Sequence, residues 1–223
     1  MDQLLSVSQS ISQLLSSADI SPLYLSHFIS TAAGTTENTN QLPPGVRHVH
    51  TNLRELRPVP VTRIYHVDSS YYTWPLYQRA LCMLAPSTSH LCKTVVLENK
   101  RSATDNPGRY ICVLVQYTHA IDTSALADLM RSQMEKPPAR KHFNYRLASP
   151  EKSLELTGFT NNAVSPIGMT QKLPIVLSQS IAQLKPPVLW LGAGHIDYKL
   201  AMPVDSFIKA TGCMVADISN STT

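Results

Sequence analysis

One lysine interrupts an apolar segment, and its setting suggests chemistry. The segment LCKTVVLE (91–98) is rich in β-branched residues and predicts a strand. Alternate side chains of a strand share a face, so Lys93 would lie in a row with Leu91, Val95 and Leu97. An unpaired charge is costly to bury there. Two interpretations are compatible: the amine reaches the rim of the sheet, or it projects into a cleft and meets an anion.

A second candidate is the segment TGFTNNAVSPIGM (157–169), in which small and turn-forming residues follow a predicted helix. A loop of this kind can direct several backbone N–H groups into one concavity, where they suit an oxyanion or a phosphate. The candidate residues are Asn162, Ala163, Val164, Ser165, Pro166 and Gly168. Many loops of this composition only connect two elements.

The third candidate is the segment GAGHID (192–197). Gly192 and Gly194 would allow the backbone to approach a ligand closely. His195 and Asp197 are two residues apart and would share a face if strand pairing begins at once. The alternative is an ordinary hairpin turn with exposed polar residues.

The sequence lacks the motifs of several other site classes. No nucleophile elbow, zinc-protease helix or phosphate-binding P-loop is present. His48 and His50 have no evident third ligand, and the four cysteines form no CxxC pair, so we expect neither a metal nor an organic cofactor. No persuasive Ser-His-Asp set appears. An enzyme with this sequence would act by positioning and electrostatics.

Basic and aromatic residues also interleave between 131 and 146. The group could touch an RNA backbone and stack a base, or form an ordinary solvated surface. Its members are Arg131, Lys136, Arg140, Lys141, His142, Phe143, Tyr145 and Arg146.

The elements that must position these candidates alternate along the chain. Strands are predicted at 61–67, 91–98 and 109–118, in LPIVLS, in a hairpin over 188–202, and in CMVADI. Helices are predicted at 75–84, 122–134, 149–156 and in VDSFIKATG. The predicted strands come in adjacent pairs and not strictly one per helix. This order favours an α/β fold of the α+β type, in which helices pack on a mixed, partly closed β-sheet.

The sequence predicts a helical extension and linker over residues 1–60 and the main domain over residues 61–223. Leu4, Leu5, Ile11, Leu14 and Leu15 fit one helical face, whereas 31–45 is rich in Thr, Asn, Gly and Pro. The N-terminus makes a poor signal peptide, and no apolar run is long enough to span a membrane. We therefore expect a cytoplasmic protein without membrane contact. A net charge of +4 permits contact with a limited piece of nucleic acid.

Three stretches together resemble the YbaK/prolyl-tRNA-synthetase-associated editing domain family: HLCKTVVLEN (90–99), ELTGFTNNAVSPIGMTQKLPIVL (155–177) and LWLGAGHIDYKLAMPVDSFIKATGCMVADI (189–218). The similarity extends over roughly 61–218, and the block from 75 to 99 resembles the free-standing eukaryotic branch. The resemblance implies a mixed α/β fold and hydrolysis of the ester between an amino acid and the tRNA 3′ end. It also implies a substrate whose own 2′-OH or side chain can help to activate the nucleophile.

Under this resemblance the family lysine falls on Lys93, the GxxxP loop on 162–166 and the glycine hairpin on 192–197. Lys93, Asn162 and Asp197 become the expected catalytic residues. The remaining members of the loop and hairpin, with Gly168, become substrate-binding residues. The sequence departs from the family where the loop glycine is Asn162, which tolerates positive φ better than most residues but would narrow a pocket.

The partners implied are the acceptor end of a mischarged tRNA and an aminoacyl-tRNA synthetase. Two rivals stay open. One is a non-catalytic module of the same fold that binds tRNA or a synthetase, and the other is a hydrolase for an unrelated small ester.

Overall fold

The computed structural model describes residues 41–56, 62–102 and 108–222. The expected N-terminal helices and most of the expected linker lie outside the described residues. Within them no helix is long and apolar enough to cross a membrane.

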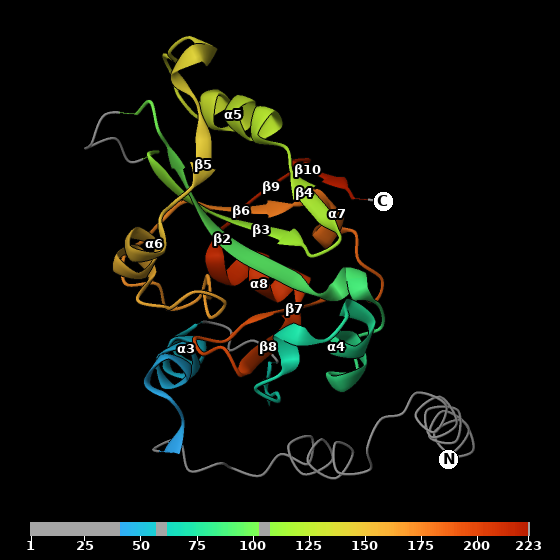
Figure 1. The fold of residues 1–223 in the computed structure, drawn as a ribbon. Coiled ribbons are helices and arrows are strands. Elements are labelled where there is room, and N and C mark those ends of the chain that lie inside the picture. Colours follow the sequence, from blue (N-terminus) through green and yellow to red (C-terminus); the bar gives the residue numbers. More distant parts are fainter. Residues whose placement is uncertain (1–40, 57–61, 103–107, 223) are drawn as a thin grey trace. The chain divides into compact units, whose positions relative to one another are not determined.

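Three β-sheets organise the described residues (Figure 1). The largest has the order β5-β2-β3-β6-β9, with β2 (Cys92–Asn99) antiparallel to β3 (Tyr110–Gln116) and to β5 (Tyr145–Leu147). Strands β6 (Ile175–Ser178) and β9 (Met214–Ala216) continue it in parallel. This sheet is therefore mixed, as the sequence predicts.

The second sheet is antiparallel, with the order β1-β8-β7. Strand β1 is Arg63–His66, and the predicted glycine hairpin joins β7 (Val188–Gly192) to β8 (Tyr198–Pro203). A parallel bridge between Leu91 and Trp190 connects the start of β2 with β7. The short strands β4 (His119–Ile121) and β10 (Ser219–Ser221) form the third sheet.

Capping residues fix the helix ends that the sequence predicts. Helix α5 (Thr123–Ser132) begins after Asp122, whose carboxylate accepts the N–H groups of Ser124 and Ala125. Helix α6 (Pro150–Thr157) begins after Ser149 and ends at the left-handed Gly158. The other short helices are α4 (Leu76–Cys82), α7 (Gln179–Ala182) and α8 (Val204–Thr211).

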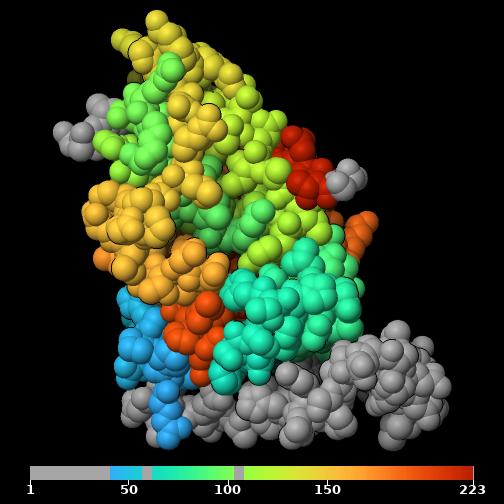
Figure 2. Space-filling model, in the orientation of Figure 1, coloured from blue at the N-terminus to red at the C-terminus, as the bar shows by residue number. Residues whose placement is uncertain are grey.

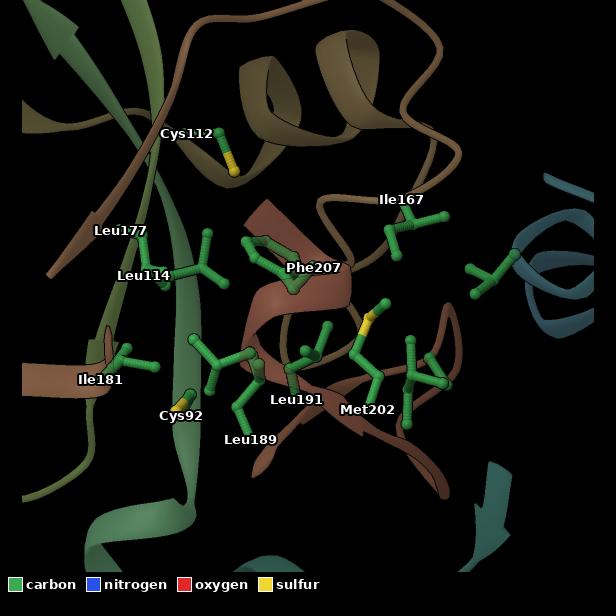
Figure 3. Packing of buried hydrophobic residues seen from close by; sticks show 14 of the residues in the cluster. Cys92, Cys112, Leu114, Ile167, Leu177, Ile181, Leu189, Leu191, Met202 and Phe207 are labelled. Carbon is green, nitrogen blue, oxygen red and sulfur yellow. The ribbon is translucent and has the colours of Figure 1, made fainter. Parts of the chain in front are cut away.

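Two apolar clusters lie on opposite faces of the largest sheet. On one face Phe207 of α8 packs among side chains of β3, β6, β7 and β8 (Figure 3). On the other face α5 covers β2 and β3 with Leu126, Ala127 and Met130. Strand alternation places Lys93 on this second face, in the row of Val95 and Leu97.

Helix α3 (Pro44–Glu55) is an element that the sequence analysis assigned to the extension and linker. Its Val49 and Leu53 are buried in the same cluster as Phe207. Gly45 touches Gly194 backbone to backbone, so that a Cβ atom on Gly45 would collide with the carbonyl oxygen of Gly194. The division at residues 60 and 61 stays a prediction, but α3 packs with the elements that follow it.

Candidate functional site

The loop after α6 and the β7–β8 hairpin meet in direct contact. The N–H of Gly194, whose φ is +85°, donates to the carbonyl oxygen of Ala163 at 3.1 Å. A Cβ atom at Gly192 would lie 2.6 Å from the carbonyl oxygen of Val164, so only glycine permits this approach. The two segments that the sequence singled out separately thus form one structure.

Asn162 opens the loop in a left-handed conformation, with φ of +61°. This is the conformation that the glycine of the GxxxP pattern suggested for this position. The Asn162 side chain is exposed, and its carbonyl oxygen accepts a hydrogen bond from the Tyr72 hydroxyl at 2.8 Å.

The backbone N–H groups of the loop divide into two sets. The N–H of Ala163 donates to Thr160 at 3.1 Å, and that of Ile167 donates to the Ser165 hydroxyl at 3.2 Å. The N–H groups of Val164, Ser165 and Gly168 have no hydrogen-bond partner in the part of the chain that the structure describes. Ala163, Ser165 and Pro166 are buried, whereas Val164 and Gly168 are half-buried.

The bridge between Leu91 and Trp190 joins the start of β2, the strand that carries Lys93, to β7 of the hairpin. The bridge is parallel, so Lys93 and Gly192 each lie two residues beyond it in the same direction. The Lys93 side chain is half-buried, and this burial lowers the pKa of its amine below the ordinary value. Among the described residues it has no hydrogen-bond or ion-pair partner.

His195 and Asp197 stand at the turn of the hairpin. The His195 Nδ1 atom accepts the N–H of Asp197 at 3.2 Å. It lies 3.8 Å from the Asp197 carboxylate, beyond hydrogen-bonding distance. The Asp197 carbonyl oxygen accepts the N–H of Val67 at 2.8 Å, and the Asp197 carboxylate is half-buried.

The sequence analysis missed a cationic and aromatic cluster beside the loop. Lys199 of β8 is 4% exposed, and its amine donates to the carbonyl oxygen of Ile196 at 2.6 Å. The amine lies 4.9 Å from the centre of the Tyr71 ring and 4.7 Å from that of Tyr72. Desolvation lowers the pKa of Lys199 to about 8, although the nearby Asp197 raises it. Lys199 could have been found from the sequence, because it interrupts an apolar strand in the same way as Lys93.

The contributing segments adjoin on one face of the described chain (Figure 2). There the gold to orange segment after α6 meets the red-orange β7–β8 hairpin and the teal segment around α4. No group of three or more metal-binding side chains occurs among the residues described.

The basic group between 131 and 146 is partly used for internal contacts. Arg140 pairs with Asp128 at 2.6 Å, and Arg131 donates to the carbonyl oxygen of Pro138. Lys136, Lys141 and Arg146 are exposed, and their side chains have no polar partner within the described ranges. The proposed contact with RNA stays a prediction.

The family of the chain follows from a match to a family model. The model of the aminoacyl-tRNA editing domain matches residues 77–210. The chain belongs to the aminoacyl-tRNA editing domain family. The match includes Lys93, the 162–168 loop and the hairpin, and it confirms the resemblance that the sequence motifs carry.

Solved structures confirm the editing-domain fold. One, provisionally assigned as a trans-editing enzyme for prolyl-tRNA synthetase, matches with a TM-score of 0.65 and 22% identity, over 81% of this chain and 100% of that one. A structure from a study of epitope grafting onto scaffold proteins matches with a TM-score of 0.64 and 18% identity, over 81% and 100%. A hypothetical protein matches with a TM-score of 0.60 and 18% identity, over 78% of this chain and 99% of that one. Among curated proteins, none matches.

Proposed function

We propose that this protein hydrolyses the ester between a mischarged amino acid and the 3′-terminal adenosine of a tRNA. It acts in trans, as a cytoplasmic deacylase of the kind that serves prolyl-tRNA synthetase. The observation that carries the proposal is the contact between the 162–168 loop and the glycine hairpin. Both segments lie within the residues that match the editing-domain model. The similar fold of the provisionally assigned trans-editing enzyme supports it.

In the proposed reaction, water adds to the aminoacyl carbonyl carbon. The N–H groups of Val164, Ser165 and Gly168 are the donors available to the oxyanion, because those of Ala163 and Ile167 already have partners. The C–O bond to the ribose then breaks, the ribose oxygen takes up a proton, and the amino acid leaves. The substrate's 2′-OH assists the attack.

Lys93 supplies the positive charge of the site. Its amine has no partner among the described residues and is partly desolvated, so it is available to an anion such as the terminal phosphate. A Lys93 amine held in a buried ion pair would instead have favoured the alternative function, a module that binds tRNA or a synthetase without catalysis. Asp197 carries the opposite charge and suits the α-amino group of the substrate.

A deacylation screen tests the proposal. Wild-type protein is mixed with a panel of mischarged and correctly charged aminoacyl-tRNAs, including tRNA for proline charged with alanine, cysteine or proline. Release of free amino acid and binding of tRNA are measured in parallel. We expect release from at least one mischarged tRNA and none from the correctly charged one. Binding without release from any member would favour the non-catalytic module.

A further inference from the structure

A tyrosine far away in the sequence holds the first residue of the loop. Tyr72 belongs to the 3-10 helix η2 (Tyr71–Thr73), and its hydroxyl donates to the carbonyl oxygen of Asn162 at 2.8 Å. The same peptide group is held from its other side, because the N–H of Ala163 donates to Thr160. Both polar atoms of this peptide bond therefore have fixed partners.

The next peptide group is held by the hairpin. The carbonyl oxygen of Ala163 accepts the N–H of Gly194. In a trans peptide the N–H points away from the carbonyl oxygen, so the N–H of Val164 is directed away from the hairpin. The Tyr72 hydrogen bond thus holds the peptide group immediately before the one that carries the first unpaired donor of the loop, the N–H of Val164.

Two cations lie close to the Tyr72 ring. The Lys199 amine lies 4.7 Å from the ring centre, and the Arg79 guanidinium lies 5.3 Å from it. Arg79 also donates to the carbonyl oxygen of Tyr72 at 2.7 Å and to that of Trp74 at 2.8 Å. Burying Lys199 is costly in itself, and the aromatic faces and the Ile196 carbonyl are its compensation.

We propose that Tyr72 is a positioning residue of the deacylation site, which holds residue 162 in its left-handed conformation and thereby aims the N–H donors of the loop. This inference rests on the proposed function. Tyr72 acts through the backbone of Asn162 and not by touching the reacting atoms.

The test compares Tyr72→Phe with the matched control Tyr71→Phe. Each variant deletes one hydroxyl of the same cluster and keeps both rings. The Tyr72 hydroxyl bonds the Asn162 carbonyl oxygen and the Tyr117 side chain, whereas the Tyr71 hydroxyl has no hydrogen-bond partner among the described residues. Steady-state deacylation gives kcat and KM, and hydrogen exchange gives the opening of 159–169. For Tyr72→Phe we expect kcat to fall about tenfold, the scale of one lost hydrogen bond. KM should stay nearly constant, exchange should quicken, and Tyr71→Phe should behave as wild type.

Three results would overturn the inference: unchanged kcat and exchange in Tyr72→Phe, an effect on KM alone, or equal effects of the two variants. An effect on KM alone would mean that Tyr72 contacts the substrate directly. If wild-type protein releases no amino acid from any tRNA, the proposed function fails. The exchange comparison then still decides whether Tyr72 holds the loop.

Discussion

Asn162 is the residue at which the chain departs from the family pattern, and its backbone explains the departure. A left-handed φ of +61° is open to glycine and tolerated by asparagine, but it is unfavourable for β-branched residues. The exposed side chain shows no hydrogen bond to another described residue. We therefore expect the site to depend on the backbone conformation at residue 162 and not on the side-chain amide.

Two substitutions at this position separate backbone from side chain. Asn162→Gly keeps the left-handed conformation and should retain deacylation within roughly tenfold, a barrier change of about 1.4 kcal/mol. Asn162→Val should lose far more, because valine resists positive φ. Single-turnover deacylation measures both, with thermal unfolding as a check on the fold. Equal damage from glycine and valine would mean that the amide takes part in the reaction.

Lys199 makes the stability of the fold depend on pH. Its pKa is about 8 in the folded chain and 10.5 ordinarily. Between these values the unfolded chain binds more protons, so the free energy of unfolding should rise with pH by on the order of 1 kcal/mol per unit. Below pH 8 both states are protonated and the slope vanishes. Urea titrations from pH 7 to 10 should show this rise relative to Lys199→Met, and parallel pH profiles would contradict the assignment.

Helix α3 packs against the elements of the proposed site. Val46, Val49 and Leu53 are almost completely buried, and His48 lies against Phe159 with ring centres 6.4 Å apart. Together with the contact between Gly45 and Gly194, this packing places α3 against the hairpin and against the segment that leads into the loop. An intact α3 is thus part of the structure that holds the loop.

Two truncations test this role of α3. A chain that begins at residue 41 keeps α3 and should unfold at the same urea concentration as the full chain. A chain that begins at residue 57 loses the burial of three apolar side chains and should be less stable by roughly 3 kcal/mol or more. It should also lose deacylation. If both truncated chains match the full chain, α3 contributes nothing to the core.

Helices and strands whose apolar residues recur at a regular spacing were predictable from the sequence. The contacts between these elements were not. The 91–98 strand, the glycine hairpin and the capped helices α5 and α6 follow from local patterns. Helix α3 escaped because its apolar residues are spaced among histidines beside a segment rich in Thr and Asn, although Pro43 and Pro44 signal a helix start. The Tyr72 contact with Asn162 joins residues that are 90 positions apart. No local pattern reports such a contact.

At the scale of the whole molecule, the residues of the proposed site come from two sheets. The mixed sheet carries Lys93, the antiparallel sheet carries the hairpin and Lys199, and the bridge between Leu91 and Trp190 joins the two sheets. The loop after α6 closes the arrangement by its contacts with Gly192 and Gly194. None of these groups is a nucleophile activated by a neighbouring base. The site therefore suits catalysis by positioning and charge.

The most direct test of this account is single-turnover deacylation of the most reactive mischarged tRNA by wild type and Lys93→Ala. Lys209→Ala removes an exposed lysine of α8 and serves as the matched control. We expect Lys93→Ala to slow release by about a hundredfold or more, the scale of one preorganised electrostatic group. Its fold should stay intact, and Lys209→Ala should keep the wild-type rate. Wild-type release by a well-folded Lys93→Ala protein would contradict the account.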